Sequence, residues 1–215
     1  MYKGIIFDMD GVLLETEQYH LEAWRQVFSH YDVSLTLEQY QDKCQSQGRE
    51  QAIKNILGTV SASTIDQISM EKKEAYEQII NTQGVTLFKD AQRLLERLKK
   101  QDIKLAIASS SKSARMVIEK TKYAHMFMHI VTGADVAKNK PSPQIFEKAQ
   151  HLLGLDPKEV VVIEDSIVGI YGALDAQMDV IGINRHDSLA SLDKQIQENE
   201  GRLKVIQSLD EIFNS

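Results

Sequence analysis

The spacing of apolar residues divides the N-terminal part of the chain into a short strand and a long helical segment. The run Ile5–Phe7 predicts a buried strand that ends at Asp8. From Glu15 to about Thr82 the apolar residues recur at helical spacing, and no run in between favours a strand. They form one stripe at Leu21, Trp24, Val27 and Phe28 and another at Ile53, Ile56 and Leu57. This segment therefore predicts amphipathic helices.

From Val85 onward, helical and strand-like segments alternate. The predicted helices cover residues 91–100, 112–122, 142–153 and 167–176, and the predicted strands cover 104–108, 130–131, 160–163, 180–183 and 204–206. Because strands separated by helices are joined by parallel crossovers, the pattern predicts a doubly wound, Rossmann-like α/β sheet. We expect a discontinuous α/β core formed by residues 1–14 and 85–215, with a helical domain inserted at 15–84.

Composition narrows the classes of function. The 215 residues carry a formal net charge of −6, which argues against a nucleic-acid-binding surface because such surfaces are basic. No apolar run approaches the roughly 20 residues that span a bilayer, and no signal segment opens the sequence. The single cysteine, Cys44, cannot form an intramolecular disulfide, which is typical of a reducing compartment. We therefore expect a cytoplasmic monomer that binds neither nucleic acid nor a membrane.

Polar side chains follow four of the predicted strands. They are, in chain order, Asp8, Asp10, Ser109, Ser110, Ser111, Lys140, Glu164 and Asp165. In doubly wound sheets, ligands bind beyond the carboxyl ends of the strands, so we expect these side chains to lie around one crevice. The sequence thus predicts a polar site at this edge of the sheet.

The chemistry of this set points to a phosphorylated ligand. Carboxylates that share a crevice repel one another and favour a divalent cation, and oxygen ligands favour Mg²⁺, which commonly shares a phosphate. Ser109 can donate to a phosphate oxygen, and Lys140 supplies a positive charge beside a transferring phosphoryl group. A carboxylate such as that of Asp8 can attack phosphorus, and Asp10 can protonate the leaving oxygen and later activate water.

Four motifs in order resemble those of the haloacid dehalogenase superfamily. They are Asp8-Met9-Asp10-Gly11-Val12, Ser109 at a strand end, Lys140-Pro141 and Glu164-Asp165-Ser166. The helical insertion after the first motif resembles the subgroup with a helical cap, which includes phosphatases of small sugar phosphates and β-phosphoglucomutase. A lone Asp-x-Asp is weak evidence, whereas four motifs at matching strand ends are specific, and the resemblance covers nearly the whole chain.

The resemblance implies a role for each residue that matches a motif. Asp8 is expected to be the nucleophile and an Mg²⁺ ligand, and Asp10 the general acid and base, with its backbone carbonyl on the metal. Ser109 and Lys140 are expected to hold the phosphoryl group. Asp165 is expected to bind Mg²⁺, and Glu164 to tune the metal site indirectly or through water. Ser110 is an open candidate for phosphate contact, since hydroxyls here can also cap a helix.

Three residues of the insertion lie in strings that resemble the substrate-facing cap positions of β-phosphoglucomutase. His20, Arg49 and Lys72 are therefore candidates for substrate binding. Arg49 could grip a second phosphate or an oxyanion, or be a solvated helix cation. For Lys72, which lies in a charged run with Glu71 and Lys73, the pattern favours a solvent-exposed helix face.

The sequence leaves the acceptor of the phosphoryl group open. Glu17 favours a phosphatase of a small sugar phosphate, which we expect, whereas His20, Arg49 and Lys72 favour a β-phosphoglucomutase. Lys89-Asp90 departs from the Pro-Gly that both groups often show, which puts specificity in doubt. Two other classes are a phosphorylated receiver module, disfavoured by length, and an inactive binding protein, disfavoured because all the motif residues are present.

Overall fold

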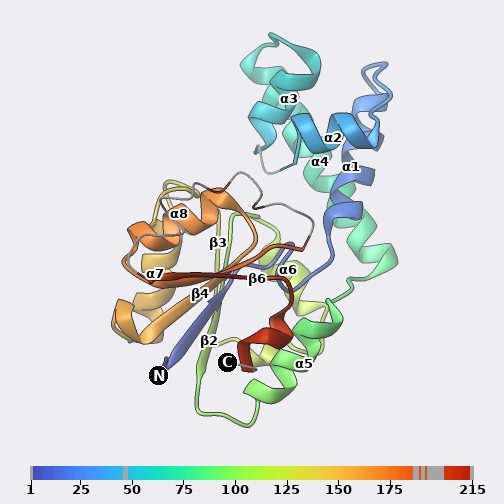
Figure 1. Cartoon of the computed structure of the whole chain (residues 1–215). Helices are drawn as coiled ribbons and strands as arrows, with labels where there is room; N and C mark the ends of the chain where they lie inside the picture. The colour runs from blue at the N-terminus through green and yellow to red at the C-terminus, as the bar shows by residue number, and fades with distance from the viewer. Residues whose placement is uncertain (1, 46–47, 186–188, 190–191, 193–200, 214–215) are drawn as a thin grey trace. The chain divides into compact units, whose positions relative to one another are not determined.

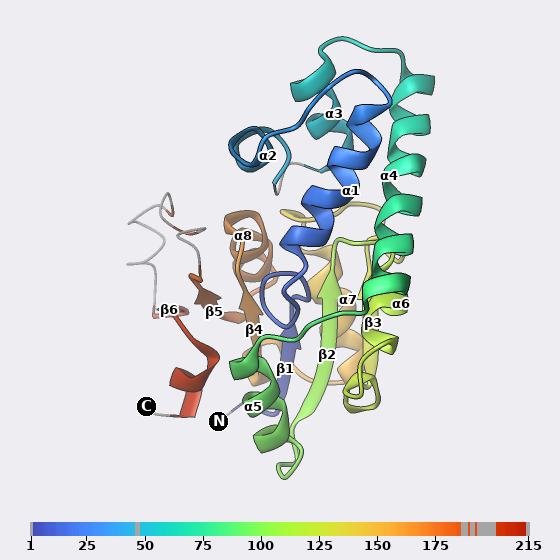
Figure 2. The same cartoon turned by 90° about the vertical axis from the view of Figure 1, so that its right-hand side faces the viewer.

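The computed structural model describes residues 2–45, 48–185, 189, 192 and 201–213. Within these ranges six strands form one sheet, in the order β3-β2-β1-β4-β5-β6 (Figure 2). The strands are β1 (Gly4–Phe7), β2 (Lys104–Ser109), β3 (His129–Thr132), β4 (Val160–Glu164), β5 (Asp179–Ile183) and β6 (Leu203–Ile206). Every neighbouring pair is parallel. The doubly wound sheet predicted from the sequence is confirmed, and each predicted strand is present.

Helices cover both faces of the sheet. They are α5 (Lys89–Leu98), α6 (Ala114–Glu119), α7 (Gln144–Leu153) and α8 (Ile167–Asp175), with short 3₁₀ turns η1 (Ala124–Met126), η2 (Pro157–Glu159) and η3 (Leu209–Phe213). Helices α7 and α8 lie on one face, and α5 and α6 on the other (Figures 1 and 2). This double cover explains why the central strands are continuous apolar runs rather than alternating ones.

Two of the predicted helices are at least two residues shorter than the apolar spacing suggested. Helix α7 begins at Gln144 instead of residue 142, with Pro143 at its N-cap. Helix α6 ends at Glu119, since the amide of Lys120 donates to the carbonyl of Val117 in a tighter turn. Both differences lie at helix ends, where apolar periodicity gives little information.

The core of the α/β unit packs the inner strands against α7 and α8. Ile6 of β1 and Val162 of β4 are fully buried beside Phe146 of α7 and Ile170 of α8. The apolar strands β1 and β4 are therefore held at the centre of the sheet, and so are the polar residues that follow them. The relative positions of these residues are set by strand pairing, because Phe7 is paired with Ile163.

The chain divides into two compact units, Met1–Glu15 with Val85–Ser215 and Thr16–Gly84. The second unit contains α1 (Glu17–Ser29), α2 (Leu37–Lys43), α3 (Arg49–Leu57) and α4 (Ala62–Gln83), so the helical pattern predicted for this segment is present. Helices α1 and α4 pack together. Trp24 of α1 stacks on Phe28, with ring centroids 4.9 Å apart. No helix in the described part of the chain is long and apolar enough to cross a bilayer.

Candidate active site

Asp8 lies directly beyond the end of β1, where the sheet itself fixes its position. Its amide donates to the carbonyl of Ile163 at 2.9 Å, which extends the β1–β4 pairing by one residue. Asp8 and Glu164 therefore emerge side by side from neighbouring parallel strands. Both residues are buried.

Lys140 joins these two carboxylates. It lies between β3 and α7, and its Nζ donates to Oδ1 of Asp8 and to Oε1 of Glu164, the latter at 2.6 Å. Only 5% of the Lys140 side chain is exposed, and its Nζ lies 5.0 Å from the ring centroid of Phe146. Because buried charges must be paired, this ammonium requires both partners. The structure thus brings together Asp8, Lys140 and Glu164, which the sequence analysis placed in one site.

Glu164 is held rigidly on its other side. Its Oε2 accepts hydrogen bonds from the amide of Ser166 at 2.7 Å and from the Ser166 hydroxyl at 2.9 Å. A Cβ on Gly169 would lie 1.8 Å from Oε1 of Glu164, so only glycine allows the carboxylate to lie against α8. Both oxygens of Glu164 are therefore occupied by protein donors, which suits a residue that orients its neighbours.

Burial and like charges set the ionisation of the site. Burial raises the pKa of Asp8 to about 7, the carboxylates of Glu164 and Asp10 add to the rise, and Lys140 opposes it. Burial by itself would lower the pKa of Lys140, but Asp8 and Glu164 raise it above its ordinary value. Burial, then Glu164 and Asp8, raise the pKa of Asp165 well above its ordinary value. One ammonium is thus outnumbered by carboxylates, an excess of negative charge that a divalent cation would relieve.

Asp165 lies against the loop that follows Asp10. Gly11 has a φ of +80°, and a Cβ there would lie 1.9 Å from Oδ2 of Asp165. Among the described residues, no three His, Cys, Asp or Glu side chains are placed to hold a metal together. The roles of Asp8, Asp10, Glu164 and Asp165 at a metal therefore stay predictions. Two carboxylates and a backbone carbonyl are a donor set that fits Mg²⁺, which keeps several waters and takes few protein ligands.

Ser109 is the last residue of β2, the other neighbour of β1. It is 1% exposed, and its Oγ accepts from the amide of Ser111 at 3.1 Å. Ser110 is exposed. Ser109 is thus placed at the same edge of the sheet as Asp8, and its contact with phosphate stays a prediction, as does that of Ser110.

The prediction that Lys72 lies on a solvent-exposed helix face is wrong. The residue is 4% exposed, and its Nζ lies 2.7 Å from Nδ1 of His20. The ammonium also lies 4.7 Å from the ring centroid of Tyr76 and 5.7 Å from that of Trp24. The His20 ring stacks on Tyr76, with centroids 4.3 Å apart. The helical unit therefore buries a lysine in contact with a half-buried histidine.

Arg49, the third candidate in the helical unit, does not join this pair among the contacts of the described residues. It is half-buried at the first turn of α3, and its Nη1 lies 3.5 Å from the carbonyl oxygen of Ser69. Burial lowers the pKa of Arg49, and the charge of Glu77 opposes that change. Roles for His20, Arg49 and Lys72 in substrate binding stay predictions.

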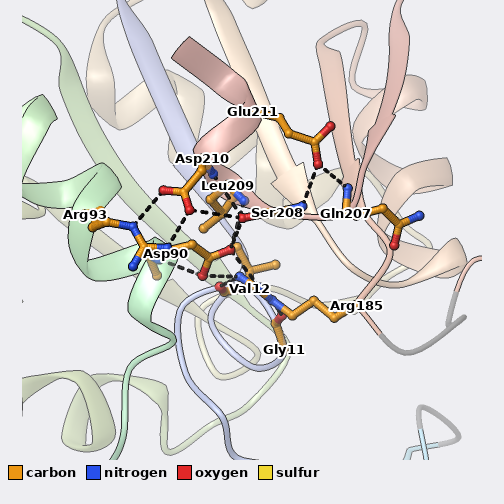
Figure 3. Close-up of polar contacts among 11 residues, drawn as sticks. Gly11, Val12, Asp90, Arg93, Arg185, Gln207, Ser208, Leu209, Asp210 and Glu211 are labelled. Atoms are coloured by element: carbon orange, nitrogen blue, oxygen red, sulfur yellow. Dashed lines mark hydrogen bonds and ion pairs between the residues drawn. The ribbon is translucent and has the colours of Figure 1, made fainter. Parts of the chain in front are cut away.

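The α/β unit holds a second polar cluster that no pattern in the sequence indicated (Figure 3). At its centre Arg185, which follows β5, forms an ion pair with Asp90 at the start of α5, with Nη1 2.8 Å from Oδ2. Asp90 drew notice only as a departure from a family pattern, and nothing in the sequence around Arg185 indicated a partner 95 residues away. The cluster reaches the loop after Asp10, as described below.

Comparison with known proteins agrees with this geometry. The family model described as haloacid dehalogenase-like hydrolase matches residues 5–183. The chain is 28% identical to the β-phosphoglucomutase of Bacillus subtilis (strain 168), over 91% of this chain and 89% of that protein. It is 27% identical to the fructose-1-phosphate phosphatase YqaB of Escherichia coli (strain K12), over 85% of this chain and 96% of that protein.

A solved structure also matches this chain over nearly its whole length. The structure of CbbY from Rhodobacter sphaeroides in complex with phosphate matches with a TM-score of 0.80 and 25% identity. The match covers 99% of this chain and 97% of that one. The similarity therefore extends over both units of the chain.

Proposed function

The chain belongs to the haloacid dehalogenase-like hydrolase family and is an enzyme, and we propose that it hydrolyses a small sugar phosphate through a phosphorylated aspartate. One observation carries the proposal: Lys140 holds the buried carboxylates of Asp8 and Glu164 at the carboxyl ends of two adjacent strands. A carboxylate fixed beside an ammonium is suited to accept a phosphoryl group, because the ammonium offsets charge on the phosphoryl oxygens.

In the first step, a carboxylate oxygen of Asp8 attacks phosphorus and the bond from phosphorus to the sugar oxygen breaks. Asp10 in its protonated form gives its proton to the leaving oxygen, so the sugar departs as an alcohol. In the second step, the carboxylate of Asp10 takes a proton from water, which attacks the phosphoaspartate. Inorganic phosphate leaves and Asp8 is regenerated. Proton transfer of this kind contributes about 10²- to 10⁴-fold to a rate.

Asp8, Asp165 and the backbone carbonyl of Asp10 would hold Mg²⁺, which when bound supplies positive charge to the phosphoryl oxygens. The chain's own residues have separate tasks. Lys140 keeps the nucleophile oriented and offsets its charge, and Glu164 keeps Lys140 in place. Ser109 would donate its hydroxyl to a phosphoryl oxygen from the end of β2.

The sugar part of the substrate would be bound by His20, Arg49 and Lys72 of the helical unit. The burial of Lys72, whose ammonium contacts the ring of His20, supports this role, because a buried charge is costly to maintain. The same pair favours a second candidate, a β-phosphoglucomutase, in which a hydroxyl of the sugar replaces water as the acceptor. The names of the relatives support both reactions on sugar phosphates.

The test is phosphate release from a panel of hexose and pentose phosphates, with Mg²⁺ and then with EDTA. The panel includes β-glucose 1-phosphate, with glucose 6-phosphate followed in parallel. Metal-dependent phosphate release that is lost in Asp8→Asn would support the phosphatase. Glucose 6-phosphate with little free phosphate would establish the mutase instead, and no turnover of any ester would contradict both.

A further inference from the structure

The guanidinium of Arg185 binds two consecutive carbonyls of the loop that follows Asp10. Its Nε donates to the carbonyl of Gly11 at 3.1 Å, and its Nη2 to that of Val12 at 3.2 Å (Figure 3). The two bonds leave from different nitrogens of one planar group. They therefore restrain both the position and the orientation of the loop, which a single-point donor could not do.

The remaining donors of Arg185 bind Asp90, whose carboxylate fixes the guanidinium in turn. Nη1 lies 2.8 Å from Oδ2 of Asp90, and Nη2 lies 3.0 Å from Oδ1. The guanidinium carbon also lies 4.0 Å from the ring centroid of Phe88. We name the ion pair of Arg185 with Asp90 the clamp.

Asp90 is anchored independently of Arg185. Its Oδ1 accepts from the amide of Ala91 at 2.8 Å, and its Oδ2 from the amide of Leu209 at 2.9 Å and the Ser208 hydroxyl at 3.1 Å. Only 7% of the Asp90 side chain and 12% of the Arg185 side chain are exposed. The clamp is thus a buried, hydrogen-bonded pair whose base is fixed to α5 and η3.

The clamp acts where the chain leaves and re-enters the α/β unit. Leu13 accepts from the amide of Phe88 at 3.0 Å, and the amide of Glu15 donates to the carbonyl of Thr86 at 2.9 Å. Arg185 contacts both sides of this pairing, through Gly11 and Val12 on one side and Phe88 on the other. It therefore holds the segment that contains Asp10 against the start of α5.

We propose that Arg185, fixed by Asp90, is a positioning residue that sets the loop of Asp10 for proton transfer to the leaving group. The inference rests on the proposed function, in which Asp10 is the general acid. Arg185 has no part in the chemistry and acts through the backbone of Gly11 and Val12. An Arg185→Lys variant keeps the charge but loses the planar fork, so it cannot bind both carbonyls and both oxygens of Asp90.

The first measurement is hydrogen exchange by mass spectrometry on peptides that cover residues 11–15 and 86–88. The second is kcat and KM for a sugar phosphate and for p-nitrophenyl phosphate, whose leaving group needs no proton. In Arg185→Lys we expect faster exchange in both segments. We also expect a fall in kcat of about 100-fold for the sugar phosphate, since a misplacement of about 1 Å can cost that much, with a much smaller fall for the aryl ester and a similar KM.

Arg93→Lys is the matched control, because Arg93 lies in the same cluster and forms a two-point bond with Asp210, with Nε 2.9 Å from Oδ1. Among its described contacts, Arg93 touches neither Gly11 nor Val12. In Arg93→Lys, hydrogen exchange in residues 11–15 and 86–88 should therefore stay as in the wild type, and so should the ratio of kcat for the sugar phosphate to kcat for p-nitrophenyl phosphate. If Arg185→Lys does not fold, Asp90→Asn, which keeps the side-chain volume, should show the same two changes to a smaller extent.

Equal falls in kcat for the two esters would overturn the proposal, because they would mean a general structural role. Unchanged exchange in residues 11–15 would overturn it too. If the wild type turns over neither ester, the proposed function is wrong and the catalytic role of the clamp with it. Exchange would then still decide whether Arg185 restrains the loop.

Discussion

The contact between Gly11 and Asp165 permits a sharp test of the site through one added methyl group. A Cβ on Gly11 would lie 1.9 Å from Oδ2 of Asp165, whereas ordinary van der Waals contact begins at 3.4 Å. In Gly11→Ala the carboxylate must therefore shift by roughly 1.5 Å, or the loop after Asp10 must move by a similar amount. Either movement changes the position of Asp165 relative to the carbonyl of Asp10, and these are two of the groups that we propose hold the Mg²⁺.

The Gly11→Ala substitution has two separate effects, one on the stability of the fold and one on activity. At a φ of +80° an alanine costs about 1–2 kcal/mol in the free energy of unfolding, whatever surrounds it. The displacement of Asp165 adds a loss of activity, and a misplacement of about 1 Å in an active site can cost 100-fold, or about 2.7 kcal/mol in activation free energy. We expect kcat/KM to fall by at least about 100-fold, and the Mg²⁺ concentration at half-maximal rate to rise.

Gly154→Ala is the matched control. Gly154 ends α7 with a φ of +64°, and nothing lies within 4 Å of a Cβ built there. Urea denaturation should show a loss of stability in both variants, whereas the Mg²⁺ titration of phosphatase activity should change only in Gly11→Ala. If Gly11→Ala keeps the kcat/KM and the Mg²⁺ dependence of the wild type, the close approach of Asp165 to this loop is not needed for activity, and the reasoning is refuted.

Three further predictions concern single residues. Asp10→Asn should lose several powers of ten in kcat with sugar phosphates and less with p-nitrophenyl phosphate, and equal losses would argue against its role as general acid. Burial raises the pKa of Cys44 to about 11, so its thiol should react with a disulfide reagent at pH 8 only after unfolding, and rapid labelling of the folded protein would contradict its burial. Burial would raise the pKa of Asp90, but hydrogen bonds from Arg185 and Leu209 hold it below its ordinary value. The stability that Asp90 contributes is therefore present above about pH 4 and is lost as the pH falls through the lowered pKa, so acid should destabilise the wild type more steeply than Asp90→Asn in thermal melts.

The residues around Lys140 were predictable because each follows a strand or precedes a helix. A parallel sheet brings the carboxyl ends of its strands to one edge, so Asp8 and Glu164 must emerge together once β1 and β4 are identified as neighbours. Apolar runs identified both strands, and strand pairing then fixed the geometry. The Lys140 bridge follows from the same logic, because a buried ammonium needs carboxylates within reach.

Lys72 shows where local patterning fails. The charges of Glu71, Lys73 and Glu74 suggested a solvated face, but a helix turns by about 100° per residue, so neighbours in sequence point in different directions. Lys72 lies four residues after Ile68 and four before Tyr76, both buried, and it shares their face of α4. Spacing by four residues would have indicated its burial, whereas adjacent charges could not.

The clamp could not have been predicted from patterning of any kind, since its members come from segments without a common period. Arg185 lies in the turn after β5, Asp90 starts a helix 95 residues earlier, and two of the acceptors are backbone carbonyls, which every residue carries. Lys89-Asp90 was noticed only because it departs from a family pattern. In the structure this departure gives a buried arginine its carboxylate, and that arginine binds the loop after Asp10. The departure at Lys89-Asp90 seemed to concern substrate specificity. It bears first on the position of Asp10, the proposed general acid.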